Sequence, residues 1–156
     1  MKVVIALINI ALIFFLAYWL RSKKDTLKRV FWPALLFKLL SGLALGLIYT
    51  YYYTGGDTFL FFNDAMLLAK LARRDVMEYC NFLWQGDKSF SISGTLYFRE
   101  PRSLLFVKIV SVFSLITADN YWVTSLCFSF LTFISSWQLV ITISRYFPTC
   151  RRAGIV

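Results

Sequence analysis

The stretch SLLFVKIVSVFSLIT, residues 103–117, decides the fold of this chain, because it determines how often the chain crosses a membrane. It is apolar, yet it is shorter than the roughly 20 residues that a spanning helix needs, and Lys108 interrupts it. These properties are typical of a helix that lies in the membrane interface. We therefore expect residues 103–117 to lie along the outer membrane surface and not to cross the bilayer.

The composition places the whole chain in a membrane. Of its 156 residues, 59% are apolar, which exceeds the roughly 45–50% found in soluble domains. The net charge is +9, but the basic residues flank apolar segments and do not form a basic face with stacking aromatics. The charge therefore indicates membrane orientation, with lipids as partners and no nucleic acid.

Three further apolar stretches are long enough to span the bilayer. They cover residues 3–20, 30–53 and 121–147. The first has no small-residue cleavage site before Arg21, which favours a retained helix over a removed signal peptide. The sequence thus predicts an all-α membrane protein with three transmembrane helices and a large outer loop, residues 54–119.

Clusters of basic residues predict the orientation, because Lys and Arg concentrate in the cytoplasmic loops of membrane proteins. They follow the first and the last span, at Arg21, Lys23, Lys24, Lys28, Arg29, Arg145, Arg151 and Arg152. We expect a multi-pass protein of the cell inner (plasma) membrane, with its N-terminus outside and its C-terminus in the cytoplasm. A fourth crossing at residues 103–117 would leave the last arginines outside.

The outer loop contains a second helical segment, residues 58–76, with a period of 3.6 residues. Its apolar face carries Phe61, Ala65, Leu68, Ala72 and Val76, and its polar face carries Asn63, Lys70 and Arg74. This pattern fits an amphipathic helix that lies on the membrane. The part of the loop between the two helical segments shows no clear period.

The second span carries two features that bear on its neighbours. Lys38 lies near enough to the cytoplasmic end for its stem to reach the headgroups. Gly42 and Gly46 form a GxxxG spacing, which allows a partner membrane helix to approach closely. The tyrosines that end this span, Tyr49, Tyr51, Tyr52 and Tyr53, suit the outer interface.

The residue types limit the chemistry to carboxylates. The chain has no histidine, the commonest zinc ligand, and Cys80, Cys127 and Cys150 have no metal-binding or redox spacing, so no metal-ligand residues are assigned and any divalent cation would depend on carboxylates. Asp57 follows Gly55 and Gly56 at the outer mouth of the second span. Such an acid either caps the following helix or acts as a general base, or it helps to hold a divalent cation.

A second acid, Asp64, lies two helical turns after Asp57 and is offset from it by only about 20° around the helix. Both carboxylates are therefore placed to border one cleft. The alternative for Asp64 is a position on a solvated polar face.

The order of these segments resembles the N-terminal part of the GT-C-fold membrane glycosyltransferases. The resemblance covers roughly residues 30–156, in the outer-loop motif GGDTFLFFNDAMLLAKLAR, the short apolar helix in REPRSLLFVKIVSVFSLI and the final span ending in SRYFPTCRRAG. Such enzymes move a sugar from a polyprenyl-phosphate carrier and use an acid in the first outer loop. They have many more spans, so the resemblance implies that this chain is one portion of such an enzyme and is inactive alone.

The resemblance implies a role for each outer-loop candidate. Asp57 takes the place of the catalytic acid that activates or orients the acceptor hydroxyl, and Asp64 binds substrate beside it. The leaving phosphate needs cationic partners, for which Lys88, Arg99 and Arg102 are the candidates. Each of these cations has lipid headgroups as an alternative partner. The aromatic rings of Tyr97 and Trp84 suit either sugar stacking or anchoring in the interface.

Two other functions stay open. A small non-enzymatic membrane scaffold or assembly subunit fits the three spans and the GxxxG spacing. A transporter fits less well, because no span carries a central acid.

Overall fold

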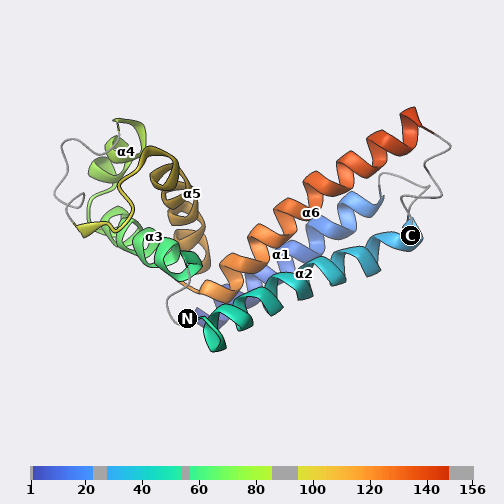
Figure 1. Cartoon of the computed structure of the whole chain (residues 1–156), viewed down its shortest axis with the longest axis horizontal. Helices are drawn as coiled ribbons and strands as arrows, with labels where there is room; N and C mark the ends of the chain where they lie inside the picture. The colour runs from blue at the N-terminus through green and yellow to red at the C-terminus, as the bar shows by residue number, and fades with distance from the viewer. Residues whose placement is uncertain (1, 23–27, 54–56, 86–94, 148–156) are drawn as a thin grey trace.

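The computed structural model describes residues 2–22, 28–53, 57–85 and 95–147, and it is shown in Figure 1. All the regular secondary structure of these residues is helical, which confirms the all-α prediction. The helices are α1 (Lys2–Ser22), α2 (Lys28–Tyr51), α3 (Asp57–Arg74), α4 (Val76–Gln85), α5 (Pro101–Thr117) and α6 (Tyr121–Tyr146).

The three longest of these helices, α1, α2 and α6, are long and apolar enough to cross a membrane. They correspond to the three predicted spans, and this confirms a multi-pass membrane protein. Figure 1 shows them as one bundle, with the start of α1, the end of α2 and the start of α6 at the same end. The opposite end of the bundle carries Arg21, Lys28, Arg29 and Arg145.

Helices α2 and α6 pack closely because α2 presents glycines to α6. A Cβ atom at Gly42 would collide with the hydroxyl of Ser129, and one at Gly46 would lie 2.9 Å from the Trp122 ring. The GxxxG spacing is therefore used inside this bundle. Nearer the basic end of the bundle, the contact between α2 and α6 is aromatic, with the ring of Phe31 against Phe133 at 5.3 Å.

Helices α3, α4 and α5, with residues 95–100 before α5, form a second group, which we call the outer unit because it comes from the predicted outer loop. Figure 1 shows the outer unit at the end of the bundle where α6 begins, set at an angle so that the molecule forms a V. The core of the outer unit forms between α3, α4 and α5, with Leu68, Phe82 and Val107 fully buried. This helix α5 is the stretch that the sequence predicts to lie along the membrane surface.

The predicted helix over residues 58–76 coincides with α3 up to Arg74, and Val76 is already the first residue of α4. Helix α3 ends at Arg74, and the side chain of Asp75 accepts a hydrogen bond of 3.0 Å from the backbone N–H of Glu78. Asp75 thus caps the start of α4 and turns the chain. As a result, Val76 does not belong to the apolar face of α3 but is exposed on α4.

The apolar face of α3 is also covered by protein and not by lipid, which corrects the expectation for this face. Ala65, Leu68 and Ala72 are buried in the core of the outer unit. The predicted polar face is exposed, as expected from the helical period. The correction follows from α5, whose apolar surface provides the partner that a helix period alone does not reveal.

Helix α5 is apolar on two sides, and only one of them faces the outer unit. The opposite stripe consists of Leu105, Ile109, Val112 and Ile116, which are exposed and share one helical face. Beside this stripe, the ring of Phe106 lies 5.9 Å from Phe128 of α6, inside the angle of the V. The exposed stripe thus borders the open side of the V, where it is suited to meet lipid.

Lys108 serves the fold of the outer unit. Its ammonium group donates a hydrogen bond of 3.0 Å to the backbone carbonyl of Leu83 and lies 5.1 Å from the centroid of the Phe82 ring. Carbonyl groups in the last turn of a helix lack helical donors and attract cations. The lysine that interrupts the apolar stretch therefore stabilises the end of α4.

Candidate functional site

The junction between the outer unit and the bundle is a short polar turn between α5 and α6. Ala118 and Asp119 both have positive φ angles, of 53° and 57°, which side-chain-bearing residues seldom adopt. Asn120 then caps α6, because its side-chain oxygen accepts hydrogen bonds from the N–H groups of Trp122 and Val123. The chain therefore reverses within a few residues.

Asp119 holds this turn to two helices of the outer unit. Its carboxylate accepts hydrogen bonds from both terminal nitrogens of Arg73, at 2.6 and 3.1 Å, and from the Ser114 hydroxyl at 2.6 Å. Burial by itself would raise the pKa of Asp119. The hydrogen bonds from Arg73 and Ser114 and the positive charges of Arg73 and Lys2 outweigh burial and hold this pKa below its usual range.

The first span joins the same junction through a buried amide. Asn9 of α1 donates one hydrogen bond to the carbonyl of Ile5, at 2.8 Å, and one to the carbonyl of Ile116 in the last turn of α5, at 3.2 Å. The side chain of Asn9 thereby provides a hydrogen-bond donor to a carbonyl in the last turn of α5, where carbonyl groups lack an N–H partner within the helix. The outer unit is thus fixed to α1 as well as to α6.

Asp57 is the first residue of α3, and it is exposed. A carboxylate in the first turn of a helix is favoured by the helix dipole, and this holds whether or not it has a chemical role. The two glycines before it lie outside the described residues. Helix α3, which Asp57 begins, follows α2 in the chain, and Tyr51, Tyr52 and Tyr53 at the end of α2 are exposed.

Asp64 is buried, with 4% of its surface exposed, and it does not lie on a solvated face. Its two oxygens accept hydrogen bonds from the backbone N–H groups of Tyr97, at 3.2 Å, and Phe98, at 2.9 Å. These bonds fix the segment before α5 to the middle of α3. Asp64 therefore has a structural task, and its role in substrate binding stays a prediction.

The same contact brings one predicted cation toward the predicted acid. The ring of Phe61, one helical turn after Asp57, stacks on the ring of Phe98 with centroids 3.9 Å apart. Arg99 follows Phe98 directly, so the backbone of this cation is held near the first turns of α3. Arg102 lies in the first turn of α5, where it is exposed, and Lys88 falls outside the described residues.

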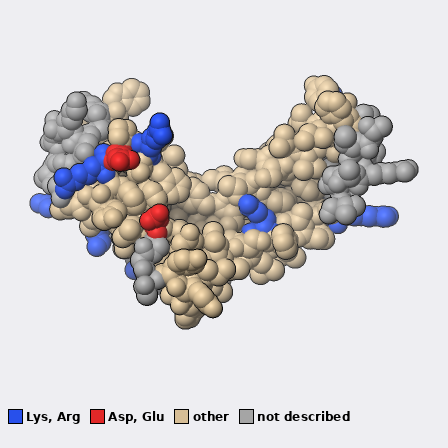
Figure 2. Space-filling view, viewed as in Figure 1, with Lys and Arg blue, Asp and Glu red and all other residues tan. Residues whose placement is uncertain are grey.

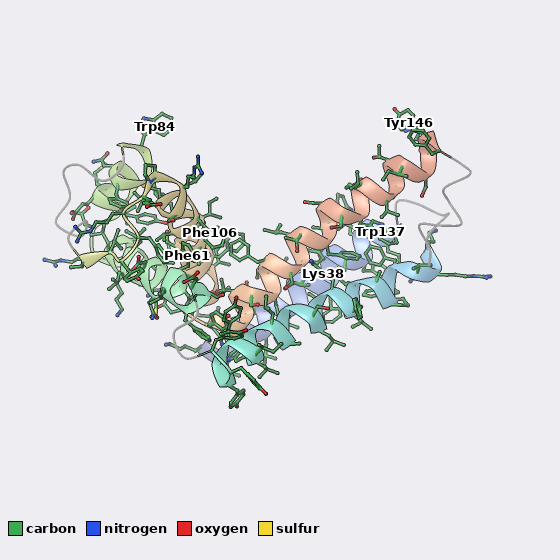
Figure 3. All side chains as sticks on the ribbon, in the orientation of Figure 1. Lys38, Phe61, Trp84, Phe106, Trp137 and Tyr146 are labelled. Carbon is green, nitrogen blue, oxygen red and sulfur yellow. The ribbon has the colours of Figure 1, made fainter. Side chains whose placement is uncertain are left out.

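Charged side chains gather on the outer unit and at the far end of the bundle, as Figure 2 shows for one face. Among the described residues, no cluster of three or more Asp, Glu, Cys or His could hold a metal ion. The exposed rings of Trp84 and Tyr97 belong to the outer unit. Figure 3 shows Trp84 projecting on the side toward which the V opens.

Sequence reasoning did not find Asn9, Arg73 or Asp119. Asp119 and Asn120 precede an apolar run, which is a usual signal for a helix start. Nothing in the local sequence, however, pairs Asp119 with a side chain 46 residues away.

In comparisons with known proteins, no family model, no curated protein and no solved structure matches this chain.

Proposed function

We propose that this chain is the N-terminal portion of a membrane glycosyltransferase that moves a sugar from a polyprenyl-phosphate carrier to an acceptor hydroxyl on the outer face of the inner (plasma) membrane. The observation that carries the proposal is an exposed acid, Asp57, which follows a span and belongs to the same unit as the exposed apolar stripe of α5. A lipid-linked donor and a polar acceptor would meet at such a place.

The orientation that this function needs is supported by the basic residues of the bundle. Arg21, Lys28, Arg29 and Arg145 lie at the end of the bundle away from the outer unit. Because basic residues mark the cytoplasmic side, the outer unit and Asp57 face outward in the proposal.

In the proposed reaction, Asp57 accepts the proton of the acceptor hydroxyl as its oxygen attacks the anomeric carbon of the sugar. The bond between that carbon and the phosphate oxygen breaks, and the electron pair leaves with the phosphate. Arg99 and Arg102 would stabilise the negative charge of the leaving group. The exposed rings of Tyr97 and Trp84 would contact the sugar or the lipid.

The test is a sugar-transfer assay in membranes that carry the protein expressed from its own gene. The probes are short polyprenyl-phosphate monosaccharides in a panel of different sugars. Asp57→Asn should lower transfer by about 100-fold or more, as expected for the loss of a general base. Glu100→Gln is the matched control, because Glu100 is an exposed acid of the same unit. Equal transfer by the wild type and Asp57→Asn would remove Asp57 from the chemistry.

A non-enzymatic scaffold or assembly subunit is the second candidate. It is favoured by the lipid-side surface of the bundle, where α6 exposes Thr132, Ser135 and Ser136 to a partner helix. Absence of transfer with every sugar, in membranes where the protein is stably assembled with another membrane protein, would favour this candidate.

A further inference from the structure

Lys38 lies in the middle of a membrane span. It is about 15 Å along α2 from Lys28 and about 20 Å from Tyr51. Its side chain is half-buried, and Figure 3 shows it on the bundle between α2 and α6. Figure 2 shows Lys or Arg surface midway along the same face. A cation at this depth is costly and is generally paired or functional.

The face that carries Lys38 is turned away from α1. On α2, Gly42 faces α6, and Trp32 turns toward α1, where its ring stacks on Phe14 at 6.4 Å. Viewed along α2, the helical period places Lys38 on one side of Gly42 and Trp32 on the other side. The α1 side is therefore covered by protein, and the side of Lys38 is not covered by any described helix.

The corresponding flank of α6 is polar. Ser129 faces Gly42, and Thr132 and Ser136 follow on the side away from α1. Their hydroxyls donate to carbonyls of their own helix, Thr132 to Phe128 at 3.1 Å and Ser136 to Thr132 at 2.9 Å. We call Lys38, Thr132 and Ser136 the lysine face. Small hydroxyl side chains of this kind let another helix approach closely.

No carboxylate of the spans can neutralise Lys38. The eight acidic residues of the chain all lie outside α1, α2 and α6. Within the described residues, Lys38 forms no hydrogen bond or ion pair. A second copy of this chain would bring the same acid-free spans, so a homodimer of these spans cannot supply the missing charge.

We propose that the lysine face binds a transmembrane helix of a partner protein that carries a carboxylate at the depth of Lys38. The carboxylate pairs with the ammonium group of Lys38, and the partner backbone packs on Thr132 and Ser136. This inference does not depend on the sugar chemistry. The competing occupant is a lipid headgroup, which Lys38 would reach by extending its stem toward the basic end of the bundle.

The test uses the full chain, reconstituted in lipid vesicles with a fluorescent donor, and synthetic leucine-alanine transmembrane peptides of about 20 residues with an acceptor. One peptide carries Asp at its centre and one carries Leu there. A third carries Asp near its N-terminus, and a fourth carries Asp near its C-terminus. Energy transfer measures association. The peptide with the central Asp should bind about threefold to thirtyfold more tightly than the peptide with Leu.

Variants of Lys38 decide whether this face is responsible. Lys38→Leu should abolish the preference for Asp, and Lys38→Asp should transfer the preference to a peptide with a central Lys. The double variant Lys38→Leu/Leu40→Lys is the matched control. It keeps a lysine at nearly the same depth but on another side of α2, where Leu40 is 62% exposed. This control should bind the central-Asp peptide no better than the Leu peptide.

Three results would overturn the proposal. The first is a preference for Asp that survives in Lys38→Leu. The second is equal binding by the wild type and the double variant, which would indicate general charge attraction. The third is strongest binding of a peptide with Asp near one end, which would place the charge of Lys38 at headgroup depth.

Discussion

Arg73 at the end of α3 and Asp119 in the turn before α6 form a two-point ion pair, with nitrogen–oxygen distances of 2.6 and 3.1 Å. This pair joins the outer unit to the first turn of a membrane span. Arg73 is 45% exposed and Asp119 13% exposed, so water and salt weaken the interaction from one side.

The first prediction concerns the energy of this pair. Arg73→Met and Asp119→Asn should each lower the stability of the protein by about 1 kcal/mol or less, because the pair is partly exposed. Asn is chosen because it tolerates the positive φ of Asp119 better than Ala does. The double variant should cost less than the sum of the single variants. Thermal unfolding in detergent measures all three, and strictly additive losses would mean that the two side chains do not interact.

The second prediction concerns pH. The pKa of Asp119 is lower in the folded protein than in the unfolded chain, where it is about 4, because Arg73 and Ser114 stabilise its charge. The stabilisation is therefore complete above about pH 4 and is lost as the pH falls through the folded pKa. Stability curves of wild type and Asp119→Asn should converge at acidic pH. Curves that stay parallel down to low pH would refute the assignment.

The third prediction separates the two acids of α3. Asp64→Asn should destabilise the outer unit by about 1–3 kcal/mol. The two oxygens of Asp64 each accept from one backbone N–H, of Tyr97 or Phe98, and the NH2 group of Asn would replace one of these oxygens and face an N–H donor. Asp57→Asn, at an exposed position, should change stability by less than about 0.5 kcal/mol. Hydrogen exchange of the Tyr97 and Phe98 amides reports the loss directly. Unchanged exchange in Asp64→Asn would argue against the structural role.

The fourth prediction tests the contact between α2 and α6. Gly42→Ala should separate the two helices, because the new methyl group collides with the Ser129 hydroxyl. Gly42→Ala/Ser129→Ala should recover much of the lost stability, since removal of the hydroxyl makes room. Ser129→Ala alone serves as the control. If the double variant is as unstable as Gly42→Ala, the clash lies elsewhere.

The fifth prediction tests the proposed orientation. Cys80 is exposed on α4, in the outer unit. In a variant in which Cys80 is the only cysteine, a membrane-impermeant maleimide should label intact cells. With Cys80 also replaced and Tyr146→Cys introduced at the far end of α6, labelling should require broken cells. The reverse pattern would invert the topology.

The spans could be predicted from sequence because length and apolarity fix them locally. Residues 3–20, 30–53 and 121–147 agree with α1, α2 and α6 within a few residues at each end. The break at Asp75 had a local signal as well, an acid followed three residues later by Glu78, but the continuous apolar face outweighed it.

The candidate site was less accessible to sequence analysis. The spacing of Asp64, Leu68 and Leu71 does put the acid on the buried side of α3, but it does not reveal the backbone donors. These donors, at Tyr97 and Phe98, come from a segment without a period. Likewise, the pair of Arg73 with Asp119 depends on how α5 returns to the bundle, and no local pattern contains that information.

The turn at Ala118 and Asp119 makes the connection between α5 and α6 very short. A spanning helix tilts more in a thinner bilayer and stands more upright in a thicker one, within the limits of its hydrophobic length. Because the outer unit is clamped to the first turn of α6, it must swing whenever α6 changes its tilt. The position of Asp57 relative to the lipid surface therefore depends on bilayer thickness, because the outer unit rotates together with α6 at this turn.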